Sequence, residues 1–328
     1  MLAKRRVELV SLALLGVALV GLALLFGDRY LDRSFIAYRY ARHLANGQGF
    51  AYNPDEPGLN DTVAPLHVVL LSLGERITPD LPRLGNLIGM AGMALGTLAI
   101  YLLAYPASRV VAAAAAGLYA LFPLLWLALG LDTPLWMALG LLTVWMHGRG
   151  WPVGAAVLLA LATLARPEIG ALAAVLVADA VIGGRPLKLL PAGMYAGIVA
   201  AGLLWLMRAV GSGPLLPGLP GLATALPPSD VLAPDVLAGL GALTKATFML
   251  SPLWTAVAAL AAAGAVRLAA KPRSDDRWVR LLVGWAVLHL AMLLILGAAV
   301  YPWSYAPLIP ALAALAAVGA QWLVELSD

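Results

Sequence analysis

The 328-residue sequence contains no cysteine and few charged side chains, which make up only 12% of its residues. The lack of cysteine excludes disulfide bonds and thiolate metal sites, and it leaves the redox compartment open. A soluble domain usually carries about 25% charged residues, whereas here hydrophobic residues reach 62% and the mean hydropathy is +0.90. Water cannot accommodate so much apolar surface, but the apolar core of a bilayer can.

Basic residues form neither a stripe nor a patch interleaved with aromatic side chains, although the formal net charge is +4. This pattern gives no indication of nucleic-acid binding, so we expect no nucleic-acid partner. The sequence also shows no clear tandem repeat and no segment typical of a soluble domain. We therefore expect a single membrane domain over residues 1–328.

Apolar segments of membrane-spanning length follow one another along the chain. The first runs over residues 7–26, longer than the apolar core of a secretory signal, so we expect it to be retained as a helix. The sequence predicts an all-α, polytopic transmembrane helix bundle of about ten spans. The expected spans are 7–27, 84–105, 109–129, 133–147, 151–165, 168–183, 187–209, 248–270, 279–300 and 304–324.

Segment 64–77 is apolar but is shorter than a usual span. If this segment does not cross the membrane, the basic clusters near 4–6, 109, 149, 185–188 and 271–280 all lie on one side, as the positive-inside rule requires. We therefore expect a surface helix here and a multi-pass protein of the plasma (inner) membrane with both termini cytoplasmic. The extracytoplasmic side then holds a first loop, 28–83, and a long Gly/Pro-rich loop, 210–247.

The first loop is the most informative stretch, because residues 34–46 are typical of a short amphipathic surface helix. Its apolar face carries Ile36, Tyr40 and Leu44. Its polar face carries the basic side chains Arg39, Arg42 and His43. We expect this helix to lie in the headgroup plane, with its cations near lipid phosphates.

Asp32 lies just before this helix and just beyond the first span. The residues alone leave two interpretations open. The carboxylate is either a helix N-cap that accepts backbone N–H bonds or a general base at the membrane surface. Four further carboxylates of the loop likewise have either a structural or a functional role, and a solvated side chain is the default interpretation for each. They are Asp28, Asp55, Glu56 and Asp61.

Arg166 and Glu168 interrupt an apolar stretch from 153 to 178. An ionisable residue at membrane depth costs about 2.5–3.5 kcal/mol on insertion scales, so such residues are usually functional or paired. One interpretation is a mutual Arg–Glu pair at a helix junction marked by Pro167, and the other is a binding site. The role of Asp132 also has two interpretations, since it is either the N-cap of the next helix or a site residue.

Several motifs follow one another along the chain. Residues 32–44 read DRSFIAYRYARHL, and Gly47-Gln48-Gly49 and Asn53-Pro54 come shortly after. Five later motifs lie at 62–66 (TVAPL), 130–133 (GLDT), 165–168 (ARPE), 213–217 (GPLLP) and 305–310 (YAPLIP). In content and order, these segments resemble the GT-C superfamily of integral membrane glycosyltransferases. The similarity is greatest to bacterial enzymes that use polyprenyl-phosphate sugars, such as arabinofuranosyltransferases and mannosyltransferases.

The resemblance implies a hexosyl- or pentosyltransferase that serves cell-envelope or cell-wall biogenesis. The donor would be a polyprenyl-phosphate-linked sugar, and the acceptor an extracytoplasmic glycan, lipid or protein. By the motif match, Asp32 is the catalytic general base, and Arg166 is expected to hold the phosphate. The other expected substrate-binding residues are Arg39, Arg42, Asp61, His67, Asp132, Glu168 and Lys245. Membrane lipids are further expected partners.

The sequence shows no required cofactor and leaves a metal undetermined, with Asp32 and Asp61 as conceivable ligands of a divalent ion. It also departs from the family motifs. The family's acidic pair is Asp32-Arg33 here, and Ala64 and Gly218 stand where the family has polar residues. Loop 210–247 is either a lid over the donor or a linker.

Two rival functions follow from the same residues. One is a transporter or lipid flippase, and the other is a non-catalytic, degenerate transferase homologue. A transporter usually places polar groups at mid-membrane and often shows inverted repeats. The polar groups here gather at one face, which favours the transferase.

Overall fold

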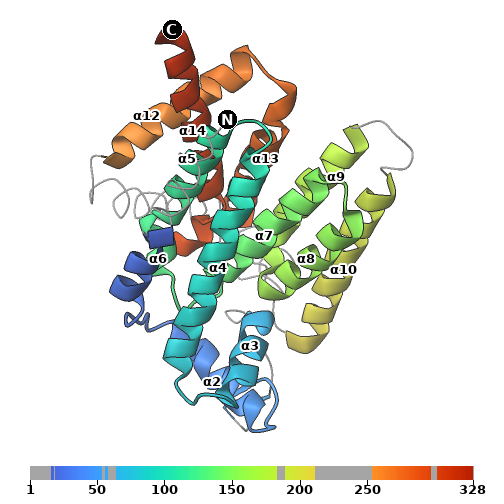
Figure 1. Ribbon diagram of the computed structural model, residues 1–328. Coiled ribbons are helices and arrows are strands. Elements are labelled where there is room, and N and C mark those ends of the chain that lie inside the picture. Colours follow the sequence, from blue (N-terminus) through green and yellow to red (C-terminus); the bar gives the residue numbers. More distant parts are fainter. Residues whose placement is uncertain are drawn as a thin grey trace.

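The computed structural model describes residues 16–17, 19–53, 56–57, 64–182, 189–210, 253–296 and 301–327. These residues form a bundle of long helices with two short helices at one end (Figure 1). A small antiparallel ribbon, β1 (Ala51–Asn53) with β2 (Glu56–Pro57), is the strand structure that the all-α prediction did not include. The predicted class, a helical membrane bundle, is confirmed.

Most helices begin and end near the predicted bounds. They are α2 (Ser34–Ala45), α3 (Pro65–Glu75), α4 (Leu81–Ala104), α5 (Arg109–Ala120), α6 (Pro123–Leu127), α7 (Thr133–Gly148), α8 (Pro152–Ala165), α9 (Gly170–Ile182), α10 (Leu189–Val210), α12 (Leu253–Ala270), α13 (Arg277–Leu296) and α14 (Leu308–Ser327), with 3-10 turns η1 (Pro167–Ile169), η4 (Ser274–Asp276) and η5 (Pro302–Tyr305). Proline lies in the first turn of α3, α4, α6, α7 and α8. There its missing N–H removes no helical hydrogen bond, which explains why these helices start where they do.

The predicted span 109–129 is divided into α5 and α6, because the chain leaves the helical conformation at Phe122, just before Pro123. In the described part of the chain, four helical segments are long and apolar enough to cross a membrane: Leu81–Ala104, Leu253–Ala270, Ser274–Ile295 and Leu308–Ser327. Shorter apolar helices accompany them, so the number of crossings stays a prediction. The beginning of the first predicted span and nearly all of loop 210–247 lie outside the described residues.

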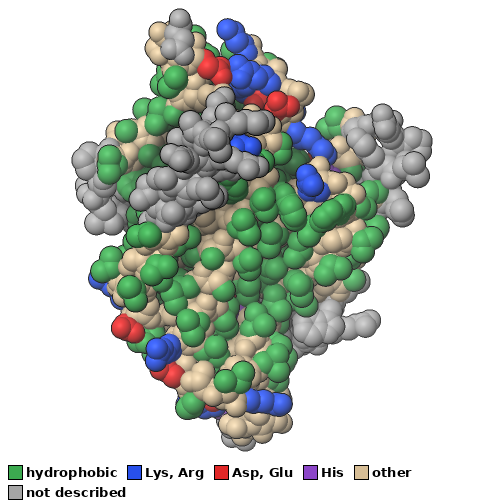
Figure 2. Space-filling view, viewed as in Figure 1, with side chains coloured by type: hydrophobic (Ala, Val, Ile, Leu, Met, Phe, Trp, Pro, Cys, Tyr) green, Lys and Arg blue, Asp and Glu red, His purple; other side chains and the backbone are tan. Residues whose placement is uncertain are grey.

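The face of the bundle drawn in Figure 2 has an apolar middle and charged ends. Figure 2 shows hydrophobic side chains over the middle of the molecule, with Lys, Arg, Asp and Glu gathered towards its two ends. Among the exposed apolar side chains, Leu98 of α4 is 48% exposed and Val157 of α8 is 54% exposed. Such a surface matches a hydrocarbon layer flanked by headgroups. The protein is therefore embedded in a membrane.

Buried aromatic rings and close helix crossings hold the bundle together. Trp136 of α7 and Trp285 of α13 are fully buried and meet edge to face, with ring centroids 6.1 Å apart. At the crossing of α12 and α14, a Cβ atom added to Gly264 would lie 2.0 Å from the backbone oxygen of Leu315. Small residues at crossings are the usual means of close helix approach in lipid.

A second apolar cluster fixes the short helices at one end of the bundle. Tyr38 and Tyr40 of α2 pack with Val68 and Leu71 of α3 and with Leu81 at the start of α4. Figure 1 shows α2 and α3 together at the end opposite the C-terminal end of α14. The predicted helices at 34–46 and 64–77 are thus present and lie at a bundle end, where a surface helix belongs.

Single-cysteine labelling tests which side of the membrane this end faces. Because the sequence has no cysteine, Gln48→Cys and Lys271→Cys each provide a unique reporter, in exposed turns after α2 and α12. We expect a membrane-impermeant maleimide to label Gln48→Cys in intact spheroplasts, and Lys271→Cys only after the membrane is opened. The reverse pattern would contradict the predicted orientation, and labelling of both in intact spheroplasts would contradict their placement at opposite faces.

Candidate functional site

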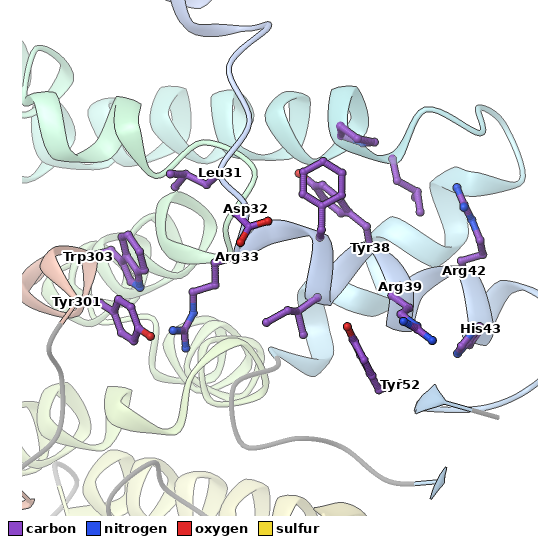
Figure 3. Close-up of a pocket in the computed structure, with 14 residues that line it drawn as sticks. Leu31, Asp32, Arg33, Tyr38, Arg39, Arg42, His43, Tyr52, Tyr301 and Trp303 are labelled. Atoms are coloured by element: carbon purple, nitrogen blue, oxygen red, sulfur yellow. The ribbon is translucent and has the colours of Figure 1, made fainter. Parts of the chain in front are cut away.

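A pocket of 1010 Å³ lies at the α2 end of the bundle (Figure 3). The described acidic and basic side chains in its lining come from one short stretch of the first loop. They are Asp32, Arg33, Arg39, Arg42 and His43. Tyr301 and Trp303, from the turn before α14, line it as well. The fold thus brings the first loop against a turn that is distant in the sequence.

Asp32 is exposed at the wall of this pocket. Arg33, not Asp32, occupies the N-cap position of α2, and no side chain caps that helix. The N-cap interpretation of Asp32 is therefore wrong. Within the described part of the chain, its carboxylate has no hydrogen bond or ion pair, so it is available to accept a proton from a ligand.

Arg33 lies over an aromatic ledge, the stacked rings of Tyr301 and Trp303. The ring centroids are 5.0 Å apart with an interplanar angle of 10°. The Arg33 guanidinium carbon lies 4.0 Å from the centroid of Tyr301 and 5.9 Å from that of Trp303. Figure 3 shows this side chain between the ledge and Asp32. A stacked guanidinium keeps the N–H groups along its edge available for in-plane hydrogen bonds.

The two other arginines of the pocket have polar partners. Arg39 donates a hydrogen bond from Nη2 to the Asn53 side-chain oxygen at 2.8 Å. Arg42 forms an ion pair with Glu75, with 3.1 Å between Nε and Oε1. These contacts tie α2 to β1 and α3. Both arginines lie in the pocket as expected for site residues, and their binding to a substrate stays a prediction.

A second polar group forms where α8 ends and α7 begins. Arg166, just before Pro167, has an extended conformation (φ −153°, ψ 126°), as expected for a residue that precedes proline. Its guanidinium binds both carboxylate oxygens of Asp132, with 3.1 Å between Nη2 and Oδ1, and donates to Thr133 Oγ1 at 3.3 Å. Of the interpretations left open, the mutual Arg166–Glu168 pair is wrong, because the described ion pair of Arg166 is with Asp132. Asp132 does occupy the N-cap position of α7, but its side chain makes no capping hydrogen bond.

The pair is largely buried, with side-chain exposures of 16% for Arg166 and 13% for Asp132. Burial by itself would raise the pKa of Asp132, but the charge and hydrogen bonds of Arg166 outweigh it. They hold the pKa of Asp132 below its ordinary value. The carboxylate is therefore ionised at neutral pH and already balances the charge of Arg166.

The turn at Gly130 connects this pair to the pocket. Gly130 has φ +83°, and its carbonyl oxygen accepts a hydrogen bond from the Tyr38 hydroxyl at 3.5 Å. His67 Nε2 lies 3.3 Å from the same oxygen and donates to it, because a carbonyl can only accept. Burial lowers the pKa of His67, so the ring is neutral at pH 7. Since Tyr38 also lines the pocket, the turn that carries Asp132 rests against the pocket wall.

The structure divides the predicted site residues into two groups. Asp32, Arg39 and Arg42 line the pocket. The second group consists of the buried Asp132–Arg166 ion pair and two further predicted residues, and none of the four lines the pocket. Its members are His67, Asp132, Arg166 and Glu168. Asp61 and Lys245 lie outside the described residues. Within the described part, no hydrogen bond or ion pair joins Arg166 to Asp32, so the assignment of donor phosphate to Arg166 stays a prediction.

Some residues of the site were not singled out from the sequence. They are Tyr38, Asn86, Thr133, Tyr301 and Trp303. Asn86 of α4 donates to the backbone oxygens of Gly27 at 2.6 Å and Arg29 at 3.0 Å, which fixes the chain just before Asp32. A polar residue inside the apolar stretch 84–105 was the signal that could have revealed it. Among the described residues, no three His, Asp or Glu side chains form a group able to hold a metal ion.

No family model matches the chain, and no curated protein matches it in sequence. Its structure is similar to the crystal structure of ArnT from Cupriavidus metallidurans bound to undecaprenyl phosphate, with a TM-score of 0.68 and 17% sequence identity. The match covers 96% of this chain and 62% of the ArnT chain, so the chain spans less than two thirds of that protein's length. ArnT is a GT-C glycosyltransferase. The chain therefore shares the fold of ArnT, and this fold agrees with the resemblance to GT-C enzymes that the order of its motifs indicates.

Proposed function

We propose that the protein is an integral membrane glycosyltransferase that moves a sugar from a polyprenyl-phosphate donor to an extracytoplasmic acceptor. The observation that carries this proposal is the pocket at the α2 end of the bundle. There the carboxylate of Asp32, without a described partner, stands among guanidinium groups. The fold similarity to ArnT, whose structure holds undecaprenyl phosphate, supports a lipid phosphate as the donor class.

The lining of the pocket suits an amphiphilic ligand. Apolar side chains line it beside the charged ones, among them Leu31, Phe35, Ile36 and Leu81. A polyprenyl tail has to remain in the bilayer while its phosphate and sugar reach the interface. A pocket at the end of a membrane bundle, with apolar and cationic walls, meets both requirements.

The proposed reaction needs one base and one cation. The oxygen of the acceptor hydroxyl attacks the anomeric carbon and forms the new glycosidic bond. The bond between that carbon and the phosphate oxygen breaks, and its electron pair leaves with the phosphate. Asp32 accepts the hydroxyl proton as general base, and guanidinium groups of the pocket balance the growing phosphate charge. For Arg166 to contact the phosphate, its pair with Asp132 would have to open.

The proposal is tested with purified protein in nanodiscs, supplied with polyprenyl-phosphate-linked pentoses and hexoses and with envelope acceptors. We expect loss of one lipid-linked sugar and an equal gain of polyprenyl phosphate, both dependent on an acceptor. Protein that binds the lipid but leaves every donor intact would contradict the proposal and indicate a non-catalytic homologue. Movement of intact donor between leaflets, measured in sealed vesicles without any transfer, would instead indicate a flippase.

A further inference from the structure

We propose that Arg33 is the residue that binds the phosphate of the polyprenyl ligand, held in place by the aromatic ledge, and that this binding needs no divalent metal. The identity of the lipid rests on the proposed function. The assignment to Arg33 rests on the geometry of the pocket. In this assignment, Arg33 binds the phosphate and the neighbouring Asp32 is the general base.

The contacts of the pocket arginines distinguish Arg33 from the other two. Arg39 and Arg42 already donate to Asn53 and Glu75. Within the described residues, the Arg33 guanidinium lies over the faces of Tyr301 and Trp303 and makes no hydrogen bond or ion pair. Its edge is therefore open to a ligand, and a planar guanidinium matches a phosphate with two parallel N–H···O bonds.

The position of Arg33 suits the proposed reaction. In a phosphate-linked sugar, the phosphate oxygen is bonded directly to the anomeric carbon that the acceptor attacks. The base and the phosphate-binding cation must therefore lie within the reach of one sugar ring. Asp32 and Arg33 are consecutive, so their Cα atoms are about 3.8 Å apart. Figure 3 shows the Arg33 side chain extending towards the ledge, away from the carboxylate of Asp32.

The charges of the pocket favour a guanidinium over a metal as the phosphate ligand. Asp32 is the one carboxylate in the described lining, and four basic residues share that lining: Arg33, Arg39, Arg42 and His43. A divalent ion such as Mg²⁺ or Ca²⁺ needs several oxygen ligands, and nearby guanidinium charges repel it. A phosphate is attracted by the same charges.

Binding of a polyprenyl monophosphate to the protein in nanodiscs tests the assignment. We expect Arg33→Gln to weaken binding by about 10- to 100-fold. Arg33→Lys is expected to cause a smaller loss, because lysine keeps the charge but not the planar fork. Arg29→Gln is the matched control. Arg29 also stacks on an aromatic ring, 4.9 Å from the centroid of Phe26, but lies outside the pocket lining, so wild-type affinity is expected.

Three further arms identify the ligand chemistry. An uncharged polyprenol is expected to bind wild-type protein and Arg33→Gln equally and weakly. Inorganic phosphate, added at the concentration of the polyprenyl monophosphate, is expected not to displace that lipid. A chelator of divalent metals is expected to leave the binding of the lipid to wild-type protein unchanged. Displacement would show that the pocket takes a free anion, and loss on chelation would show that a metal holds the phosphate. Either result overturns the proposal.

The protein variants decide the role of Arg33 itself. Wild-type affinity in a thermally stable Arg33→Gln or Arg33→Lys protein would overturn the assignment. The lysine variant keeps the test decisive if the glutamine variant fails to fold. Binding that depends on Arg33 without any sugar transfer would instead overturn the proposed function and leave the phosphate site in place.

Discussion

Replacement of Asp32 by asparagine is expected to slow sugar transfer by about 10²- to 10⁴-fold, the usual contribution of a positioned general base. The amide has nearly the shape of the carboxylate but cannot take a proton from the acceptor hydroxyl. Asp32 has no described partner whose loss would disturb the fold, and the cations of the pocket remain in place. We therefore expect kcat to fall while the affinity for the lipid phosphate is retained. Initial rates over a range of donor concentrations separate the two.

Asp28→Asn is the matched control for this change. Asp28 is an exposed carboxylate four residues earlier in the same segment, and it does not line the pocket. It should retain wild-type transfer, which would exclude a general effect of negative charge near the membrane surface. Wild-type transfer by Asp32→Asn would remove Asp32 from the mechanism.

The helices were predictable because apolar length and proline act locally. Proline in the first turn marks the start of α7 and α8, and Pro167 ends α8 at Arg166. The apolar face of α2 follows from helical spacing alone, and Tyr40 is buried on it as expected. The break of 109–129 at Pro123 is the exception, because the apolar length of this segment predicts one span although the proline interrupts the helix.

The partners of charged residues were harder to predict, since a chain offers many candidates at any distance. Glu168 is the partner that the sequence suggests for Arg166, because the two are only two residues apart. The carboxylate that binds Arg166 is that of Asp132, 34 positions earlier. The ion pair forms because the tertiary structure brings the turn into η1 next to the start of α7. No local sequence rule predicts that contact. The aromatic ledge shows the same limit, because residues 301–303 meet Arg33 only once the helices are assembled.

Arg166→Ala is expected to lower the free energy of unfolding by about 3–5 kcal/mol, because it leaves the carboxylate of Asp132 buried without a cation. Thermal unfolding in detergent, at a pH where Asp132 is ionised in the wild type, measures the loss. The double variant Asp132→Asn/Arg166→Gln removes both charges and should recover most of it. Arg149→Ala, at an exposed arginine after α7, should change stability by less than about 0.5 kcal/mol.

The double variant also separates a structural role of Arg166 from the phosphate-binding role predicted for it from the sequence. In the structure its guanidinium is occupied by Asp132 and lies outside the pocket lining. We therefore expect the stable double variant to bind polyprenyl phosphate with nearly wild-type affinity, in contrast to Arg33→Gln. If the double variant is stable but loses binding, the pair must open for the ligand. Arg166, on a helix break far from the first loop in sequence, would then be the phosphate ligand after all.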